Sequence, residues 1–249
     1  MSTQDAEKPR STEHAQRLFV LPKDATEVVL VRHGATQGMV DGQPFDADED
    51  GHGNPPLSPD GEEQARLVGD RLYAEPVDYA RLFVTTLRRT HQTAARFAAL
   101  TGLEPEPIRD LREIHLGEWE LGEYRRRIAD RDPLIVRSFL EQRWGVIPGA
   151  EQDEDFAARV RRGFDEIVAR SGPGVSVVAV VHGGVIAEMC RQATGSEAFA
   201  FLGADNTSLN RFIVFGDGRV RLRTFNDTGH LDALRARARS AGEASEPLV

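Results

Sequence analysis

Short apolar runs rich in valine alternate along the chain with longer segments whose apolar residues recur at helical spacing. The runs at 27–31, 79–85 and 175–181 end at turn residues, which is typical of buried parallel strands. Amphipathic spacing predicts helices at 60–74, 87–100, 156–169 and 184–193, and one or two more within 124–144, interrupted near Pro133. This alternation indicates a layered α/β domain with a mostly parallel sheet.

Capping and turn residues mark several boundaries of these elements. Ser58 followed by Pro59 predicts an N-cap and a first helical position at the start of 60–74. The sequence Gly216-Asp217-Gly218 separates two strand-like runs, 209–215 and 219–225, and predicts a hairpin near a sheet edge. Such a hairpin leaves open whether the protein is a monomer or a homodimer.

The two ends of the chain lack an apolar pattern. Residues 1–24 are polar, and residues 233–249 alternate small with charged side chains. We expect a flexible N-terminal arm at 1–24, a single domain at 25–232 and a flexible tail at 233–249.

Composition narrows the classes of partner. The chain of 249 residues carries a net charge of −9, which argues against nucleic acid, because that affinity depends on many Lys and Arg contacts to phosphates. A small anion held in a local basic pocket remains compatible with this charge. A single cysteine, Cys190, and the absence of a membrane-length apolar run favour a cytoplasmic protein without a membrane partner.

Basic and polar side chains follow three of the predicted strands at their carboxyl ends. They are Arg32 and His33 after 27–31, Thr85, Arg88 and Arg89 after 79–85, and His182 after 175–181. Open α/β sheets bind ligands at this edge, and a predicted helix begins just after the second and third groups. Guanidinium groups, imidazoles and the amides of helix N-termini together suit a tetrahedral dianion. We therefore expect a phosphate pocket here.

Five motifs occur in order and cover roughly residues 27–225. They are RHG at 32–34, PLSPDG at 56–61 followed by Gln64-Ala65, TLRRTHQTA at 86–94, LREIHLGEWE at 111–120 and VHGG at 181–184. Together they resemble the histidine phosphatase superfamily, in the phosphoglycerate mutase-like branch that contains cofactor-dependent mutases and small broad-range phosphatases. The resemblance implies a three-layer α/β sandwich with a mostly parallel central sheet.

The resemblance also implies catalytic roles. His33 would be the nucleophile that becomes phosphohistidine, which divides one difficult displacement into two easier ones. Glu113 would donate a proton to the leaving alkoxide and then, as carboxylate, activate water; Glu118 and Glu120 are nearby rivals for this role. Groups that would bind the phosphoryl oxygens are Arg32, Arg89, a positively charged His182, Thr36 and Asn206. No metal or other cofactor is implied.

Two departures from the family pattern keep alternatives open. Ala35 stands where the family often has Glu, and Met39 stands near the usual position of an Asn that contacts phosphate. The acidic segment 38–53 does not resemble the longer aromatic and Asn-rich segment of mutases, so hydrolysis of a small phosphorylated metabolite is favoured over a phosphoglycerate mutase. A non-catalytic module that binds a phosphorylated ligand is a third hypothesis. A metal hydrolase is disfavoured because paired ligand spacing is missing.

The substrate's leaving group is not specified by these motifs. Fold and pocket define the reaction class, whereas segments 38–53 and 124–144 would select the leaving group. Within the second segment, Arg125 or Arg137 could cover an anionic substrate. We expect His52 and His230 at the surface.

Overall fold

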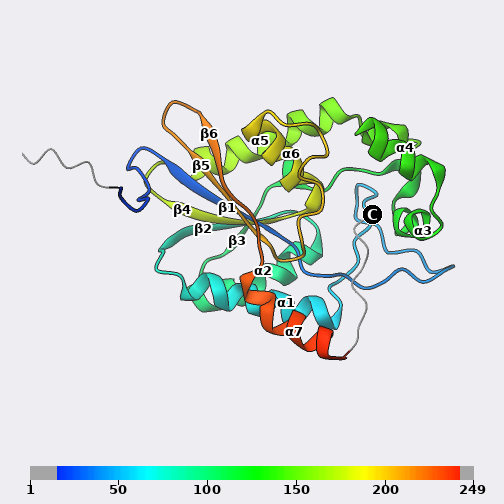
Figure 1. Ribbon diagram of the computed structural model, residues 1–249, viewed down its shortest axis with the longest axis horizontal. Coiled ribbons are helices and arrows are strands. Elements are labelled where there is room, and N and C mark those ends of the chain that lie inside the picture. Colours follow the sequence, from blue (N-terminus) through cyan, green and yellow to red (C-terminus); the bar gives the residue numbers. More distant parts are fainter. Residues whose placement is uncertain (1–15, 242–249) are drawn as a thin grey trace, which may run out of the picture.

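The computed structural model describes residues 16–241 and contains a six-stranded sheet in the order β3-β2-β4-β1-β5-β6 (Figure 1). The strands are β1 Thr26–Arg32, β2 Tyr79–Val84, β3 Pro105–Pro107, β4 Ser176–Val181, β5 Leu209–Val214 and β6 Val220–Asp227. Pairing is parallel from β3 through β2 and β4 to β1, and antiparallel from β1 to β5 and from β5 to β6. The sheet is therefore mostly parallel, as predicted.

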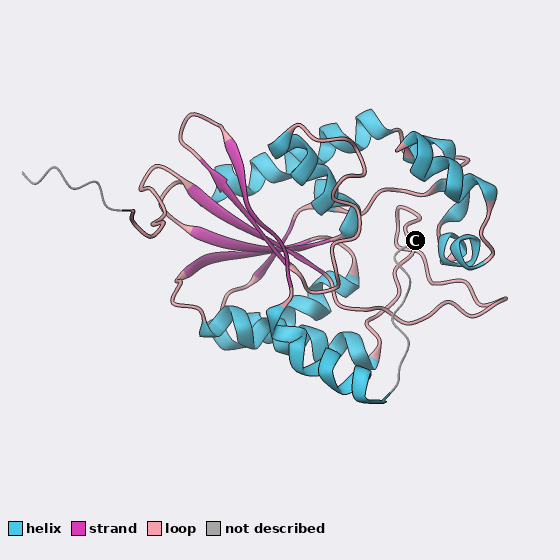
Figure 2. Cartoon of the chain, viewed as in Figure 1, coloured by secondary structure: helices cyan, strands magenta, loops and turns pink. Residues whose placement is uncertain are grey.

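Helices cover both faces of this sheet (Figure 2). Helices α1 (Pro59–Ala74), α2 (Arg88–Thr101) and α7 (Asp232–Ala241) lie on one side, and α5 (Asp153–Ser171) and α6 (Gly183–Thr194) lie on the other. Helices α3 (Glu123–Ala129) and α4 (Pro133–Glu141) stand apart from the sheet, beyond the carboxyl ends of its parallel strands. The predicted three-layer α/β sandwich is confirmed.

Alternating strand residues divide the core into two apolar layers. In β1, Val28 and Leu30 face the α5–α6 side, while Val29 and Val31 face the α1–α2 side. All four side chains are fully buried. Each such burial stabilises the fold by roughly 1.5–3 kcal/mol relative to exposure. Burial on both faces explains why the strand is a continuous apolar run in the sequence.

The expected C-terminal tail is partly helical, which corrects the prediction for 233–249. Helix α7 continues to Ala241, and residues 242–249 lie outside the described part of the chain, as do residues 1–15 of the expected arm. Alanine and arginine are strong helix formers, so α7 is favoured without an apolar stripe. Arg235 anchors the helix by donating to the Thr228 hydroxyl at 2.6 Å and to the Asp205 carboxylate at 3.0 Å.

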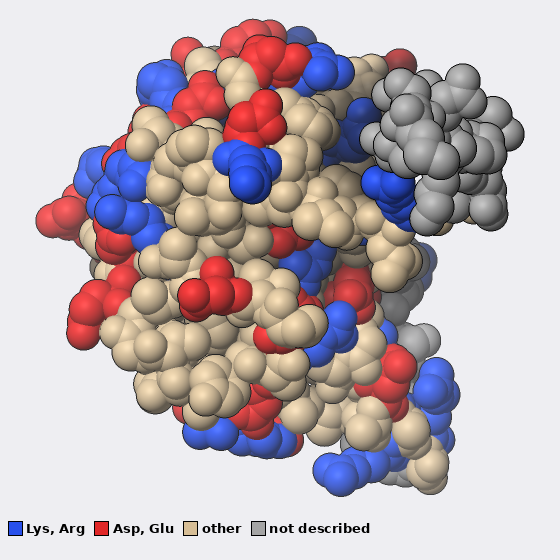
Figure 3. Space-filling view, turned by 90° about the vertical axis from the view of Figure 1, so that its left-hand side faces the viewer, with Lys and Arg blue, Asp and Glu red and all other residues tan. Residues whose placement is uncertain are grey.

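Charges are mixed on the surface at the opposite end of the sheet from the parallel strands' carboxyl ends. Figure 3 shows acidic and basic side chains interspersed on that face. Among residues 16–241, no helix combines the length and the apolar content needed to cross a bilayer.

The loop after β1 rests directly on the first turn of α1. Ser58 caps α1 by accepting a hydrogen bond from the Gly61 amide at 3.1 Å, and Pro59 opens the helix, as predicted. The Ser58 amide donates to the Ala35 carbonyl at 2.9 Å. A Cβ atom on Gly61 would lie 1.8 Å from the Ala35 carbonyl oxygen, and one on Gly34 would lie 2.6 Å from the Gly61 oxygen. Glycine at both positions lets the two backbones touch.

We expect Gly61→Ala to lower the free energy of unfolding by about 2 kcal/mol. Alanine is favoured over glycine by about 1 kcal/mol inside a helix. The clash with the Ala35 carbonyl costs about 3 kcal/mol, which outweighs this gain. Chemical denaturation measures the difference. Gly38→Ala is the control, because no atom lies within 4 Å of its Cβ position. Equal stability of the two variants would contradict this account of the loop.

Candidate active site

His33 follows β1 directly and is only 8% exposed. Its Nδ1 lies 2.8 Å from the Gly34 carbonyl oxygen, which can only accept, so Nδ1 carries the proton. In the neutral ring, Nε2 then holds a free lone pair. The backbone on either side is also fixed, because the His33 amide donates to the Val181 carbonyl at 3.0 Å and the Gly34 amide donates to the Thr93 hydroxyl at 3.0 Å.

His182 ends β4 and forms the N-cap of α6. Parallel pairing of Arg32 with Val181 brings the two following histidines side by side, with ring centroids 5.2 Å apart. His182 is fully buried, and its Nε2 lies 3.0 Å from the Thr85 hydroxyl at the end of β2. Its Nδ1 makes no hydrogen bond within the described part of the chain.

Two arginines flank the histidines. Arg89, in the first turn of α2, is 7% exposed and donates to the Gly53 carbonyl at 2.9 Å. Arg32, at the end of β1, donates to the Ala204 carbonyl. The Arg88 side chain is exposed to solvent, and its guanidinium lies 3.8 Å from the Asp46 carboxylate. Of the two adjacent arginines, the structure therefore places Arg89 in the pocket.

The electrostatics of the pocket favour neutral imidazoles. Burial, followed by the positive charges of Arg89 and Arg32, holds the pKa of His33 well below its ordinary value. Burial and then Arg89 lower the pKa of His182 in the same way, which disfavours the predicted positive charge on His182 in the ligand-free site. Burial also lowers the pKa of Arg89 to about 10, which still leaves its guanidinium charged at neutral pH.

Glu113 lies at the N-terminus of α6. Its carboxylate accepts from the Gly184 amide at 3.1 Å, where the helix dipole favours negative charge. A Cβ atom on residue 184 would come within 2.4 Å of this carboxylate, so glycine is required there. Of the two rivals, Glu118 is exposed, and Glu120 accepts from the amides of Gly53 and Leu116, both at 2.8 Å.

Two predicted phosphate ligands have other contacts. The Asn206 amide nitrogen donates to the His33 carbonyl at 2.8 Å, so this side chain fixes the backbone of the histidine. The Thr36 hydroxyl accepts from Arg125 of α3. Met39 packs against Gly122, since a Cβ atom there would lie 2.6 Å from Met39 Cγ. Met39 therefore has a packing role where the family often has an asparagine.

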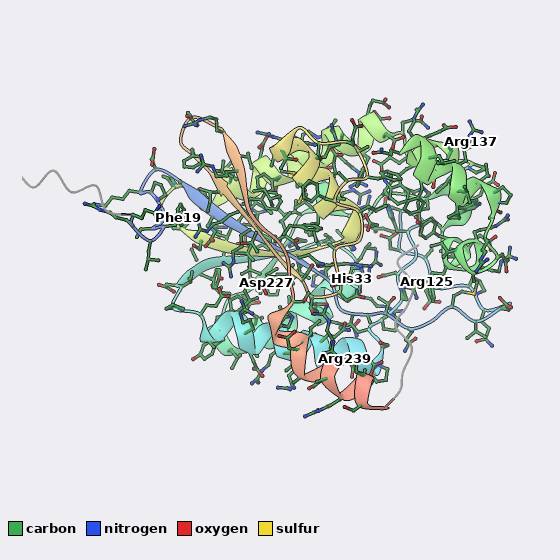
Figure 4. The ribbon with its side chains drawn as sticks, viewed as in Figure 1. Phe19, His33, Arg125, Arg137, Asp227 and Arg239 are labelled. Carbon is green, nitrogen blue, oxygen red and sulfur yellow. The ribbon has the colours of Figure 1, made fainter. Side chains whose placement is uncertain are left out.

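Of the two arginines of segment 124–144 that could cover a substrate, Arg125 is the one that approaches His33. It donates to the Gln37 carbonyl at 2.8 Å, its guanidinium lies 5.2 Å from the centre of the Phe45 ring, and its charge lowers the pKa of His33. Arg137 lies on the outer surface of α4, away from His33, and pairs with Glu141 at 2.6 Å (Figure 4). The sequence alone does not distinguish Arg125 from Arg137 as the residue that approaches the pocket.

The acidic segment 38–53 is held against the loop that follows β3. Arg112 pairs with Asp48 and Asp50, and Arg109 also pairs with Asp50. His52 is 6% exposed, with its ring 4.9 Å from that of His115, so the predicted surface position of His52 is wrong. His230 is also partly buried and lies 3.1 Å from the Thr207 hydroxyl. Among the described residues, no group of three or more His, Cys, Asp or Glu side chains could hold a metal ion.

The strand ends of the parallel sheet thus bring together two buried histidines, two arginines and a glutamate. The chain belongs to the histidine phosphatase superfamily (branch 1), whose family model matches residues 28–228. The resemblance read from the five motifs is thereby confirmed.

Three similar proteins illustrate the range of the family. The chain is 32% identical over 208 residues to the bifunctional protein Rv2228c of Mycobacterium tuberculosis, covering 83% of this chain and 55% of that protein, so it spans about half that protein's length. It is 30% identical over 219 residues to the metal-independent phosphoserine phosphatase of Arabidopsis thaliana, covering 85% of each. The structure of mycobacterial glucosyl-3-phosphoglycerate phosphatase Rv2419c is similar with a TM-score of 0.65 at 27% identity, covering 82% of this chain and 100% of that one.

We expect His33 to remain neutral at pH 6.5 and Arg125→Ala to raise its pKa. Removing a nearby positive charge makes protonation of the imidazole easier, so the acidic limb of the pH–rate profile should move to higher pH. Imidazole chemical shifts of His33, followed by NMR against pH, measure the change. Arg126→Ala is the control, because Arg126 pairs with Glu123 and Asp130 on the exposed face of α3. An unchanged His33 pKa in Arg125→Ala would show that Arg125 does not act on the nucleophile.

Proposed function

We propose that this protein is a metal-independent phosphomonoesterase that hydrolyses a small phosphorylated metabolite through a phosphohistidine on His33. The observation that carries the proposal is the state of this imidazole. Its Nδ1–H is held by the Gly34 carbonyl, and burial beside two arginines keeps the ring neutral. A neutral ring in this tautomer presents the Nε2 lone pair that nucleophilic attack requires.

In the first step, His33 Nε2 attacks phosphorus, the N–P bond forms, and the P–O bond to the alcohol breaks. Arg32 and Arg89 stabilise the charge on the equatorial phosphoryl oxygens, which is the largest contribution to catalysis in this reaction class. With its Nε2 accepting from the Thr85 hydroxyl, a neutral His182 carries its proton on Nδ1 and donates a hydrogen bond from Nδ1–H to a phosphoryl oxygen, without giving up the proton. His182 therefore contributes without a positive charge. Glu113 gives a proton to the departing oxygen.

In the second step, Glu113 as carboxylate removes a proton from a water molecule. The water oxygen attacks phosphorus, the N–P bond breaks, and inorganic phosphate leaves with His33 restored to its neutral form. The position of Glu113 at the N-terminus of α6, next to the His182 cap, supports its action as a carboxylate in this second step. No step requires a metal ion.

The segment 38–53 supports hydrolysis over mutase activity. Its carbonyl at Gly53 accepts from Arg89, and the Arg88 amide donates to the Asn54 side chain at 2.9 Å, so the segment is bound at the rim of the pocket. A mutase must hold a bisphosphorylated intermediate in two orientations and exclude water. The acidic side chains of this segment disfavour a second phosphate at that rim.

The central test is hydrolysis of p-nitrophenyl phosphate in EDTA by the wild type and by His33→Ala. We expect wild-type turnover to persist in EDTA and the variant to lose at least a thousandfold in kcat, because the covalent route is closed. His91→Ala, on the exposed side of α2, is the matched control and should behave as wild type.

Four results would contradict the proposal. Wild-type turnover in His33→Ala would exclude the covalent route, and loss of activity in EDTA would point to a metal hydrolase. Binding of phosphate esters by the wild type, with no turnover on any monoester tested, would identify a binding module. Conversion of 3- to 2-phosphoglycerate would establish the mutase alternative.

A further inference from the structure

Glu113 lies in a segment without regular secondary structure. Between β3 and α3 the chain forms only two short 3-10 turns, at Arg109–Leu111 and Gly117–Trp119. Backbone carbonyls in such a segment need partners from elsewhere, because no helix or strand ladder satisfies them. Three of these carbonyls share one partner, the side chain of Arg159 on α5.

The Arg159 guanidinium uses all five of its N–H donors behind this segment. Nη1 donates to the carbonyls of Asp110 at 2.9 Å and Arg112 at 2.6 Å, and Nη2 donates to the carbonyl of Glu113 itself at 2.9 Å. The remaining two donors bind the Glu151 carboxylate, at 2.6 Å through Nε and 2.7 Å through Nη2. Only the rigid fork of arginine offers this number of directed donors.

Glu151 also binds the backbone of the segment, two residues beyond Glu113. Its carboxylate accepts from the His115 amide at 3.2 Å, and its own amide donates to the His115 carbonyl at 2.8 Å. The paired side chains are 14% exposed for Arg159 and 17% for Glu151. Burial raises the pKa of Glu151, but hydrogen bonding and charge from Arg159 outweigh this, so its pKa lies below the ordinary value. The pair is therefore charged at neutral pH.

The same part of α5 also supports the other end of Glu113. Phe156 lies under the Arg159 guanidinium, 4.8 Å from ring centre to Cζ. Its ring edge is 3.5 Å from the Cβ position of Gly184, whose amide binds the Glu113 carboxylate. Helix α5 thus binds the Glu113 backbone through Arg159 and packs through Phe156 beside Gly184, whose amide binds the Glu113 carboxylate.

We propose that Arg159 and Glu151 are positioning residues that aim the Glu113 carboxyl group at the leaving-group oxygen. The proposal rests on the proposed function, in which Glu113 donates the proton. Glu113 needs a fixed backbone because a displacement of about 1 Å costs on the order of a hundredfold in rate. Neither Arg159 nor Glu151 has to touch the substrate.

The choice of leaving group separates positioning from general structural support. p-Nitrophenolate departs readily without a proton, whereas the alkoxide of 2-glycerol phosphate needs one. The value of kcat/KM reports the step that releases the leaving group. Misplacing Glu113 should therefore reduce kcat/KM for the alkyl ester far more than for p-nitrophenyl phosphate. The ratio of the two values does not depend on how much of a variant is folded, so partial unfolding leaves the readout intact.

We expect Arg159→Lys and Glu151→Gln each to lower kcat/KM for 2-glycerol phosphate by about a hundredfold and for p-nitrophenyl phosphate by less than about fivefold. Arg162→Lys is the matched control. It lies on the same helix and its Nε reaches the Asp110 carboxylate at 3.0 Å, but it binds no backbone carbonyl of the segment. This variant should keep the wild-type ratio.

Glu113→Gln, measured in parallel, distinguishes failure of this inference from failure of the proposed function. If Glu113→Gln loses activity selectively on the alkyl ester while Arg159→Lys and Glu151→Gln reduce both substrates equally or neither, the positioning role is overturned and the proton-donor role stands. If Glu113→Gln itself shows no selectivity, Glu113 is not the proton donor and both fall together.

Discussion

A buried positive charge beside two buried imidazoles is the constraint on which the pocket depends. Burying a guanidinium costs several kcal/mol unless it is compensated. Arg89 donates to the neutral carbonyl of Gly53, and the charges of Glu113 and Glu120 offset part of the cost of its burial. Burial and then the charge of Arg89 lower the pKa of both His33 and His182. In the proposed function, a phosphate dianion would pair with the guanidinium groups of Arg89 and Arg32. The proposed nucleophile, His33, would then be kept neutral by burial and by the same arginines that bind its target.

The sheet brings His33 and His182 together, and several segments around them have no regular secondary structure. Parallel pairing of β1 with β4 places His33 beside His182, so that their rings are in contact. Around them, polar side chains bind main-chain groups: Glu120 holds the Gly53 amide, Asn206 holds the His33 carbonyl, and Arg159 holds the Glu113 carbonyl. Each bond satisfies a backbone group that no ladder would satisfy. The geometry of the candidate site therefore rests on side chains that bind its main chain.

The sequence predicts well whatever follows from local pattern. The strands at β1, β2 and β4 and the helices that follow them were predicted to within a few residues, because valine-rich runs and helical spacing are local signals. The positions of His33 and His182 follow from the same prediction, because each comes directly after one of these strands. In contrast, β3 is a three-residue edge strand that begins and ends with proline, which argues against a strand. Helix α7 has propensity but little apolar patterning, so it was predicted as a tail.

Tertiary contacts account for the rest of what the sequence could not predict. The burial of His52, the approach of Arg125 to Thr36 and the use of Asn206 on the His33 carbonyl all join residues far apart in the chain. The charge state of His182 depends on burial, which one sequence does not quantify. In the sequence, Arg159 is one of several arginines in the amphipathic segment 156–169, with nothing to distinguish it. Only the fold shows that it binds the backbone of Glu113.

The most direct test of the central claim is to trap the covalent intermediate. Wild-type protein would be mixed with a labelled phosphomonoester, quenched within milliseconds in alkali, and digested for mass spectrometry. The account predicts an acid-labile, alkali-stable phosphoryl group on the peptide that contains His33, formed at the rate of leaving-group release. A phosphoryl group on another residue, or turnover with no phosphorylated protein at any time, would contradict it.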